Sequence, residues 1–130
     1  MYIELYFDPT CQIFAGPVNE GFSEALHLME ELRRKGIEVE IRDTGKMSEE
    51  ERQKAYWKVI GPTVRKKYSV RQVFGSRRRG GGPHFGKEVP ALLVYREKGD
   101  QYPEDVYPHQ KEGKILTIKE FVEQLLRAEE

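Results

Sequence analysis

This sequence has few of the residues that cross-link small proteins or anchor them in membranes. Cys11 is the only cysteine among 130 residues, so no disulfide can form within the chain. Small secreted domains commonly depend on disulfides, and we therefore expect a cytoplasmic protein. The N-terminus carries Glu4 and lacks the basic leader of a signal peptide. No apolar run approaches the roughly 20 residues of a membrane span, so we expect no membrane partner.

The chain also lacks an excess of either charge. Its 22 basic and 22 acidic residues cancel, whereas proteins dedicated to nucleic acids usually carry a basic excess. No glycine-rich phosphate motif follows a predicted strand, and the histidines show no zinc-ligand spacing. We therefore expect no metal and no resident cofactor. The hydrophobic fraction of 38% is sufficient for one folded domain over residues 1–130.

The first part of the chain predicts a β-α-β unit. Residues 2–7 (YIELYF) are aromatic and branched, which is typical of a strand. Residues 19–36 carry apolar side chains at helical spacing and end in Gly36, a residue suited to a left-handed helix cap. Residues 37–42 (IEVEIR) alternate strictly between apolar and charged, as in a half-exposed strand. A right-handed crossover makes these two strands parallel.

The middle of the chain predicts helices. Ser48 and Glu51 form a capping box at the start of the stretch 48–60, in which we expect Tyr56 and Trp57 to belong to the core. Gly61 and Pro62 end this helix, and residues 62–72 form another that starts at the proline.

The last part predicts two strands and a closing helix. Residues 89–95 (VPALLVY) are almost continuously apolar, as in a strand buried on both faces. Residues 97–100 (EKGD) form a turn. The stretch 104–113 is an edge strand, because prolines interrupt it. Thr117 starts the final helix with a capping box to Glu120.

These elements predict an α/β fold with a four-stranded mixed sheet in the order 2-1-3-4 and helices on both faces. The first and third strands occupy the middle because they are the most apolar, and the alternating second strand and the proline-bearing fourth strand form the edges.

Residues 73–88 (VFGSRRRGGGPHFGKE) break the pattern. Five of these residues are glycine and three consecutive ones are arginine, so we interpret the stretch as a loop. Arginine side chains and glycine-rich backbone bind anions, and arginine-glycine segments also bind RNA. A solvated loop without a ligand is the simplest alternative.

The order of elements resembles the thioredoxin-like fold, β-α-β-α-β-β-α. KYSVRQ (67–72) followed by VPALLVYREKGD (89–100) is similar to the thioredoxin stretch in which a helix leads into a proline-led strand and a hairpin. KILTIKEFVEQLL (114–126) looks like the closing helix of that family. The resemblance covers most of the chain and implies that Pro90 is cis and lies beside a reactive Cys11.

Two departures from that family shape the functional prediction. Phe14 stands where the CxxC motif has its second cysteine, so a dithiol mechanism within one chain is excluded. The chain then resembles monothiol glutaredoxin-like members, in which an outside thiol resolves a mixed disulfide. Residues 73–88 form an insertion before the third strand, and we expect them to share one end of the sheet with Cys11.

The first hypothesis is therefore a thiol-dependent oxidoreductase with Cys11 as nucleophile and a protein disulfide or a small anionic thiol, such as glutathione, as partner. The expected substrate-binding residues are Thr10, Arg77, Arg78, Arg79, His84, Val89 and Pro90. Arginine and histidine side chains near a thiol favour the reactive thiolate.

Two alternatives remain open. In one, Cys11 is a small buried side chain and the protein is a redox-inactive thioredoxin-like module that binds a protein or nucleic acid through the inserted loop. In the other, Asp8 to Cys11 resembles the cysteine entry of arsenate-reductase-like proteins, which hold an oxyanion. Val89 stands where those proteins carry an arginine, which argues against this second alternative. The sequence leaves the oligomeric state undetermined.

Overall fold

The computed structural model describes residues 1–9, 21–59, 90–111 and 113–128. The inserted loop and the helix predicted to begin at Pro62 lie outside the described residues, so the structure does not test them. The described elements are β1 Tyr2–Phe7, α1 Phe22–Arg34, β2 Glu38–Asp43, a 3-10 turn η2 Thr44–Lys46, α2 Glu49–Val59, β3 Ala91–Tyr95, β4 Asp105–Tyr107, β5 His109–Lys111, β6 Lys114–Leu116 and α5 Ile118–Ala128.

Four of the strands form one mixed sheet in the order β2-β1-β3-β4, which confirms the predicted order. β1 pairs in parallel with β2, and it pairs antiparallel with β3 on its other side. β3 in turn pairs antiparallel with β4. All residues of β1 and β3 are buried, whereas β2 and β4 are only partly buried. The two most apolar strands therefore occupy the middle of the sheet, as predicted.

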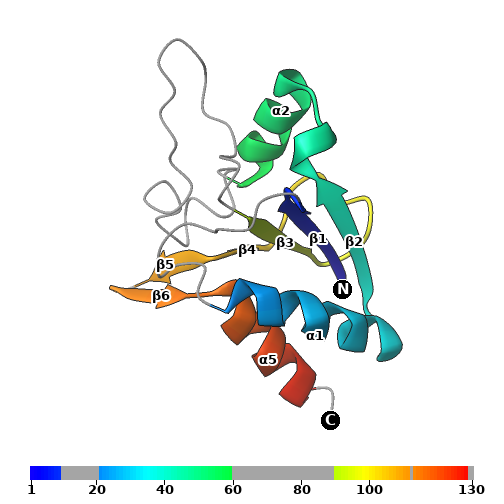
Figure 1. Ribbon diagram of the computed structural model, residues 1–130, viewed down its shortest axis with the longest axis vertical. Helices are drawn as coiled ribbons and strands as arrows, with labels where there is room; N and C mark the ends of the chain where they lie inside the picture. Colours follow the sequence, from blue (N-terminus) through cyan, green and yellow to red (C-terminus); the bar gives the residue numbers. More distant parts are fainter. Residues whose placement is uncertain (10–20, 60–89, 112, 129–130) are drawn as a thin grey trace.

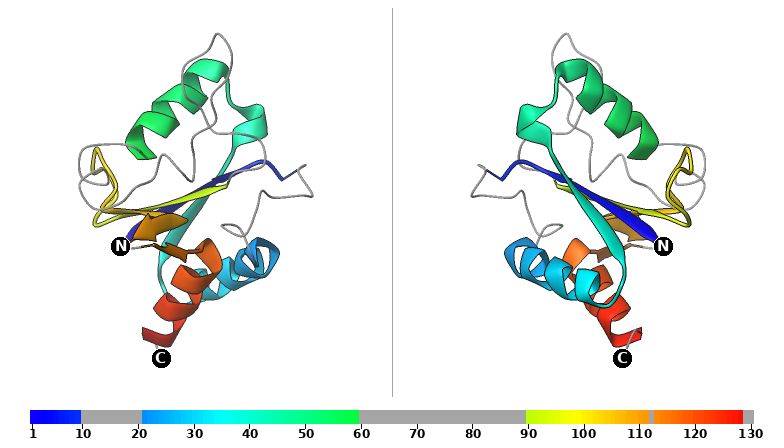
Figure 2. Two further views of the ribbon diagram at one scale, coloured as in Figure 1. Left: turned by 90° about the vertical axis from the view of Figure 1, so that its left-hand side faces the viewer. Right: turned by 90° about the vertical axis from the view of Figure 1, so that its right-hand side faces the viewer.

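Helices lie on both sides of this sheet, which confirms the predicted layout. α1 and α5 lie together on one side, and α2 lies on the other (Figures 1 and 2). The views in Figure 2 show the sheet edge-on between the α1–α5 pair and α2. The two sides of the sheet consequently meet different parts of the chain.

The main hydrophobic core lies between the sheet and the α1–α5 pair. Alternate β1 residues Ile3, Leu5 and Phe7 point into it, because successive side chains of a strand face opposite ways. The helices contribute these fully or almost fully buried side chains: Phe22, Ala25, Met29, Leu32, Ile118, Val122 and Leu126. Burial of this apolar surface is the main stabilising contribution to the fold.

The predicted helix ends are confirmed by their hydrogen bonds. Glu51 N donates to Ser48 Oγ at 3.2 Å, and Ser48 N donates back to Glu51 Oε1 at 3.4 Å, which completes a capping box at α2. Glu120 N donates to Thr117 Oγ1 at 3.1 Å at the start of α5. Gly36, just after α1, has a φ of +91°, a value that side chains with a Cβ adopt only at a cost.

The edge strand β2 is tied to the helix that precedes it. Arg33 Nη2 and Nε, near the end of α1, both donate to the Val39 carbonyl oxygen, at 2.8 and 3.2 Å. Two N–H groups of one guanidinium therefore converge on this single acceptor. Ile41 on the same strand is largely exposed, although the alternation of residues 37–42 predicted it on the buried face, because β2 is an edge strand.

The stretch 104–113 differs from the single edge strand predicted for it. β4 contains only Asp105–Tyr107, and the chain then pairs β5 with β6 in a separate two-stranded hairpin. The Tyr107 ring stacks on the Phe121 ring of α5 at 4.3 Å and lies 4.6 Å from the His109 ring. His109 is buried and its Nδ1 lies 2.8 Å from the Val106 carbonyl oxygen. The tertiary contacts of these rings therefore determine the conformation of residues 104–111, where the local sequence pattern is ambiguous.

One core prediction for α2 is wrong. The Trp57 side chain is 52% exposed, so it does not belong to the core, and the structure does not describe the Tyr56 side chain. The spacing of the apolar residues in α2 does not assign them to a single face of the helix. Among the described side chains of α2, only Ala55 is buried. Among the described residues, no helix has both the length and the apolar character needed to cross a membrane.

Candidate functional site

Most of the predicted site residues lie outside the described part of the chain. These are Thr10, Cys11, Arg77, Arg78, Arg79, His84 and Val89. Pro90 is described and buried, directly before β3. The predicted cis bond joins Pro90 to Val89, and it too lies outside the described residues. The structure therefore leaves the grouping of Cys11 with the arginine loop as a prediction.

The described residues do define the end of the sheet from which the chain leaves toward Cys11. Tyr6 pairs with Ala91 in the antiparallel register, so the residues that come next, Phe7 on β1 and Pro90 before β3, are neighbours across the two strands. Asp8 follows β1 directly and is buried. The carboxyl end of β1 and the start of β3 consequently meet at one edge of the sheet.

Two carboxylates converge at the same end. Phe7 pairs with Asp43 in the parallel register of β1 and β2. Asp43 Oδ1 accepts a hydrogen bond from Gly45 N at 2.8 Å, which starts the turn η2. A Cβ on Gly45 would lie 3.0 Å from Asp8 Oδ2 and 3.1 Å from Asp43 Oδ1. The absence of a side chain at position 45 therefore lets both carboxylates approach the turn closely.

A second polar group lies on the sheet face opposite the main core. Tyr2, Glu4 and Tyr6 alternate with the core residues of β1, and they face Glu40 and Arg42 of β2 and Tyr95 of β3. We call these residues the Glu4 cluster: Tyr2, Glu4, Tyr6, Glu40, Arg42 and Tyr95. An open cavity of about 390 Å³ adjoins the cluster and is lined by all of its members except Tyr6.

Hydrogen bonds in the Glu4 cluster converge on the two carboxylates. Tyr6 Oη donates to Glu4 Oε1 at 3.3 Å, and Arg42 Nη2 donates to Glu4 Oε2 at 3.4 Å. Tyr2 Oη lies 3.2 Å from Glu4 Oε2 and makes a shorter hydrogen bond to Glu40 Oε2. Arg42 Nη2 also forms an ion pair with Glu40 Oε1 at 3.1 Å. Glu4 is thus a buried carboxylate in the middle of the sheet with donors on several sides.

This arrangement changes the acid–base properties of its members. Burial raises the pKa of Tyr2, Tyr6 and Tyr95 well above the ordinary value, and the negative charge of Glu4 raises them further. The hydrogen bond from Tyr2 lowers the pKa of Glu40. Partial burial opposes the charged form of Arg42, but Glu40 and Glu4 outweigh it and raise the pKa of the guanidinium. The three tyrosine hydroxyl groups therefore keep their protons well above neutral pH.

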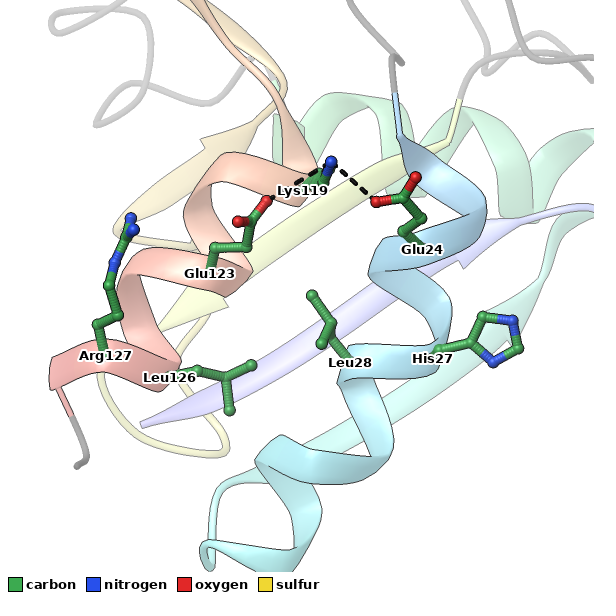
Figure 3. A pocket seen from close by; sticks show the side chains of 7 residues that line it. All are labelled: Glu24, His27, Leu28, Lys119, Glu123, Leu126 and Arg127. Atoms are coloured by element: carbon green, nitrogen blue, oxygen red, sulfur yellow. Dashed lines mark ion pairs between the residues drawn. The ribbon is translucent and has the colours of Figure 1, made fainter.

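A groove between α1 and α5 is a second cavity lined by charged groups. Lys119 Nζ on α5 forms an ion pair with Glu24 of α1 at 2.8 Å and a longer one with Glu123 at 3.9 Å (Figure 3). The hydrogen bond from Lys119 lowers the pKa of Glu24. His27 also lines the groove and is exposed. These charges join the two helices at the surface, where single ion pairs contribute little to stability.

Comparison with known proteins gives no match for this chain. No family model, no curated protein and no solved structure is similar to it at a significant level. Among the described residues, no group of histidine, cysteine, aspartate or glutamate side chains is arranged to hold a metal ion. The interpretation of function therefore depends on the topology and on the residues themselves.

Sequence reasoning missed the Glu4 cluster. The usable signal is Glu4 itself, a charged residue in the middle of an otherwise apolar and aromatic strand. Its neighbours at positions two before and two after are tyrosines, and period-two spacing puts all of them on one face. Arg42 and Tyr95 join the cluster only through the register of the sheet, which the sequence does not state.

Proposed function

We propose that this protein is a thioredoxin-like monothiol protein that carries out thiol–disulfide exchange through Cys11. The supporting observation is the register of β1 against β3, which brings Pro90 beside the carboxyl end of β1. The sheet order and the helices on its two sides are those implied by the thioredoxin-like resemblance of the sequence. Since one fold supports many functions, the proposal is argued from the site rather than from topology alone.

Chain connectivity links Cys11 to this end of the sheet. Asp8 is buried at the end of β1, and Cys11 follows three residues later. Three residues of extended chain reach at most about 11 Å, whatever conformation they adopt. Val89 and Pro90 are joined by one peptide bond at the neighbouring strand. These distances are compatible with a substrate held between the Cys11 sulfur and the backbone before β3.

The proposed chemistry is an exchange of disulfide bonds that conserves electrons. The Cys11 thiolate attacks one sulfur of a substrate disulfide, a bond forms between the two sulfurs, and the other substrate sulfur leaves as a thiolate. A second, external thiolate then attacks the mixed disulfide and releases Cys11. An external thiol is needed because the chain has no other cysteine. Glutathione is a suitable donor of that thiol.

Anion recognition is assigned to the inserted loop. Arg77, Arg78 and Arg79 offer forked N–H donors that suit the carboxylates of a peptide thiol. His84 adds a group that is partly cationic near neutral pH. Positive charge near Cys11 would also lower the pKa of the thiol and increase the thiolate fraction. Thr10, next to Cys11, supplies a hydroxyl group for the substrate backbone.

The test is the rate of Cys11 alkylation by iodoacetamide as a function of pH. We expect an inflection clearly below the free-thiol pKa of about 8.5, and a shift upward when Arg77, Arg78 and Arg79 are all changed to Gln. Mass spectrometry should detect a mixed disulfide with glutathione that Cys11→Ser abolishes. Cys11 is the only thiol, so every signal belongs to it.

A slowly reacting thiol that titrates at 8.5 or above, together with no mixed disulfide, would refute the proposal and favour the redox-inactive binding module. In that case, deletion of residues 76–83 should abolish capture of the partner.

A further inference from the structure

The cavity beside the Glu4 cluster lies away from the proposed thiol site. It adjoins Tyr2 and Glu4 in the first half of β1, whereas Asp8 follows the end of that strand. Four residues of extended strand separate Glu4 from Asp8, which corresponds to about 13 Å. The cavity therefore lies beside a different part of β1 from the carboxyl end that leads toward Cys11.

Glu4 is a buried charge with loose compensation. The residue is 5% exposed, and its three hydrogen bonds measure 3.2, 3.3 and 3.4 Å. Strong hydrogen bonds from a hydroxyl to a carboxylate are about 2.5–2.7 Å long. Tyr2 has one proton and directs it to Glu40, its closer partner, which weakens its contribution to Glu4. A buried carboxylate normally requires tighter partners than these.

Tyr95 gives a second, independent observation. Its side chain is 3% exposed and lines the cavity, but its hydroxyl forms no hydrogen bond within the described part of the chain. Burial, the charge of Glu4 and a loose hydrogen-bonding interaction with its carboxylate all raise the pKa of Tyr95, but the hydroxyl does not reach Glu4 with good hydrogen-bond geometry. An unsatisfied buried hydroxyl is costly, and a bound ligand or an ordered water commonly explains one.

The groups in this cavity with hydrogen-bonding capacity left over include acceptors. Glu4 and Tyr95 both line the cavity, and the Tyr2 and Tyr95 rings lie 5.6 Å apart at an angle of 41°. Lys98 Nζ already lies 5.6 Å from the Tyr2 ring centroid, so that ring accepts a cation. The cations at the rim have partners: Lys98 pairs with Glu38 at 2.9 Å and Arg42 with Glu40 at 3.1 Å.

We propose that this cavity binds a small organic cation that carries a primary ammonium group. The N–H groups of the ammonium donate hydrogen bonds to Glu4 and Tyr95. The aliphatic part of the ligand lies against the tyrosine rings. Lys58 also lines the cavity, so a small anion held by Lys58 and Lys98 is the competing occupant. The buried carboxylate of Glu4 favours the cation: its ion pair with Arg42 is long, at 3.4 Å, so a cation adds compensation there, whereas an anion would place a second negative charge beside it.

The test uses n-butylammonium chloride as the probe and sodium n-butyrate at equal ionic strength as the opposite charge. Binding is followed by ¹H–¹⁵N chemical-shift changes of the full chain up to about 20 mM, since so small a ligand binds in the millimolar range. We expect butylammonium to shift the amides of β1 and β3 and butyrate to leave them unchanged. Shifts with butyrate but not with butylammonium would overturn the proposal. The absence of shifts with both probes would overturn it as well.

Two variants and a matched control sharpen the result. Tyr95→Phe should weaken butylammonium binding about threefold to tenfold, the usual value of one hydrogen bond. Glu4→Gln should weaken it by tenfold or more, because a charge-assisted bond is lost. Tyr102→Phe, at a tyrosine 43% exposed and outside the cavity, should have no effect. If Glu4→Gln does not fold, Tyr95→Phe still decides, because unchanged affinity in that variant contradicts the proposal.

Discussion

Replacing Tyr95 with phenylalanine should stabilise the protein in the absence of ligand. The change keeps the buried ring of β3 and removes one hydroxyl that has no hydrogen-bond partner among the described residues. A buried polar group without a partner costs about 1–3 kcal/mol. The favourable field of Glu4 and the small void left by the missing oxygen reduce the gain. We therefore expect the free energy of unfolding to increase by about 1 kcal/mol.

The measurement is urea unfolding followed by circular dichroism. With a urea m-value of about 2 kcal/mol/M, the midpoint of Tyr95→Phe should rise by roughly 0.5 M. Tyr102→Phe should change stability by no more than about 0.5 kcal/mol, because that side chain is largely exposed.

Tyr6→Phe provides a comparison of opposite sign. Tyr6 Oη donates to Glu4 Oε1 at 3.3 Å, so its removal should destabilise the protein by about 1 kcal/mol. A loss of about 1 kcal/mol or more in Tyr95→Phe would refute the reasoning, because the Tyr95 hydroxyl would then have a stabilising partner. In that case the Glu4 cluster would be a complete structural network rather than a binding site.

Three further substitutions test other parts of the structure. Gly21 and Gly36 have φ values of +75° and +91°, so alanine at either position should cost about 1–2 kcal/mol in urea unfolding. Gly21→Ala should cost more, because its Cβ would collide with Lys119 Cδ, whereas nothing lies within 4 Å at Gly36; equal losses would show that Lys119 moves aside freely. Burial and the neighbouring Asp105 raise the pKa of Tyr107 to about 12 from an ordinary 10.0. The unfolded chain releases that proton first, so this contribution to stability is complete below pH 10 and is lost between pH 10 and 12. Tyr107→Phe should therefore lose less stability than the parent between these pH values, and equal losses in the two proteins would contradict this assignment.

Much of the fold could be predicted because local pattern and tertiary structure agree. The apolar stripe of α1, the capping box Ser48–Glu51 and the continuous β3 run each have a single sensible interpretation, and the structure confirms them. The β5–β6 hairpin was not predicted, because its strands are only three residues each and carry no clear alternation. Trp57 was assigned to the core by its residue type, but α2 has no strong apolar face to direct it inward.

The candidate sites were less predictable than the fold. Pro90 could be assigned to the start of a buried strand, and the structure confirms that it is buried there. The role of Cys11 depends on the charges around it, which a linear sequence does not specify, and that role stays a prediction. Tyr95 and Arg42 are 53 positions apart in the sequence, and they face a common cavity only because both strands pair with β1.

The bond between Arg33 and the Val39 carbonyl affects how this protein behaves at high concentration. β2 is an edge strand, and an edge strand with free backbone groups can recruit a strand from another molecule and begin aggregation. Arg33 donates two hydrogen bonds to the Val39 carbonyl oxygen, which makes that oxygen less available as an acceptor for such pairing. The charged residues Glu38, Glu40 and Arg42 along the same strand further discourage an incoming chain. A single arginine at the end of a helix thus contributes to colloidal solubility as well as to the link between α1 and the sheet.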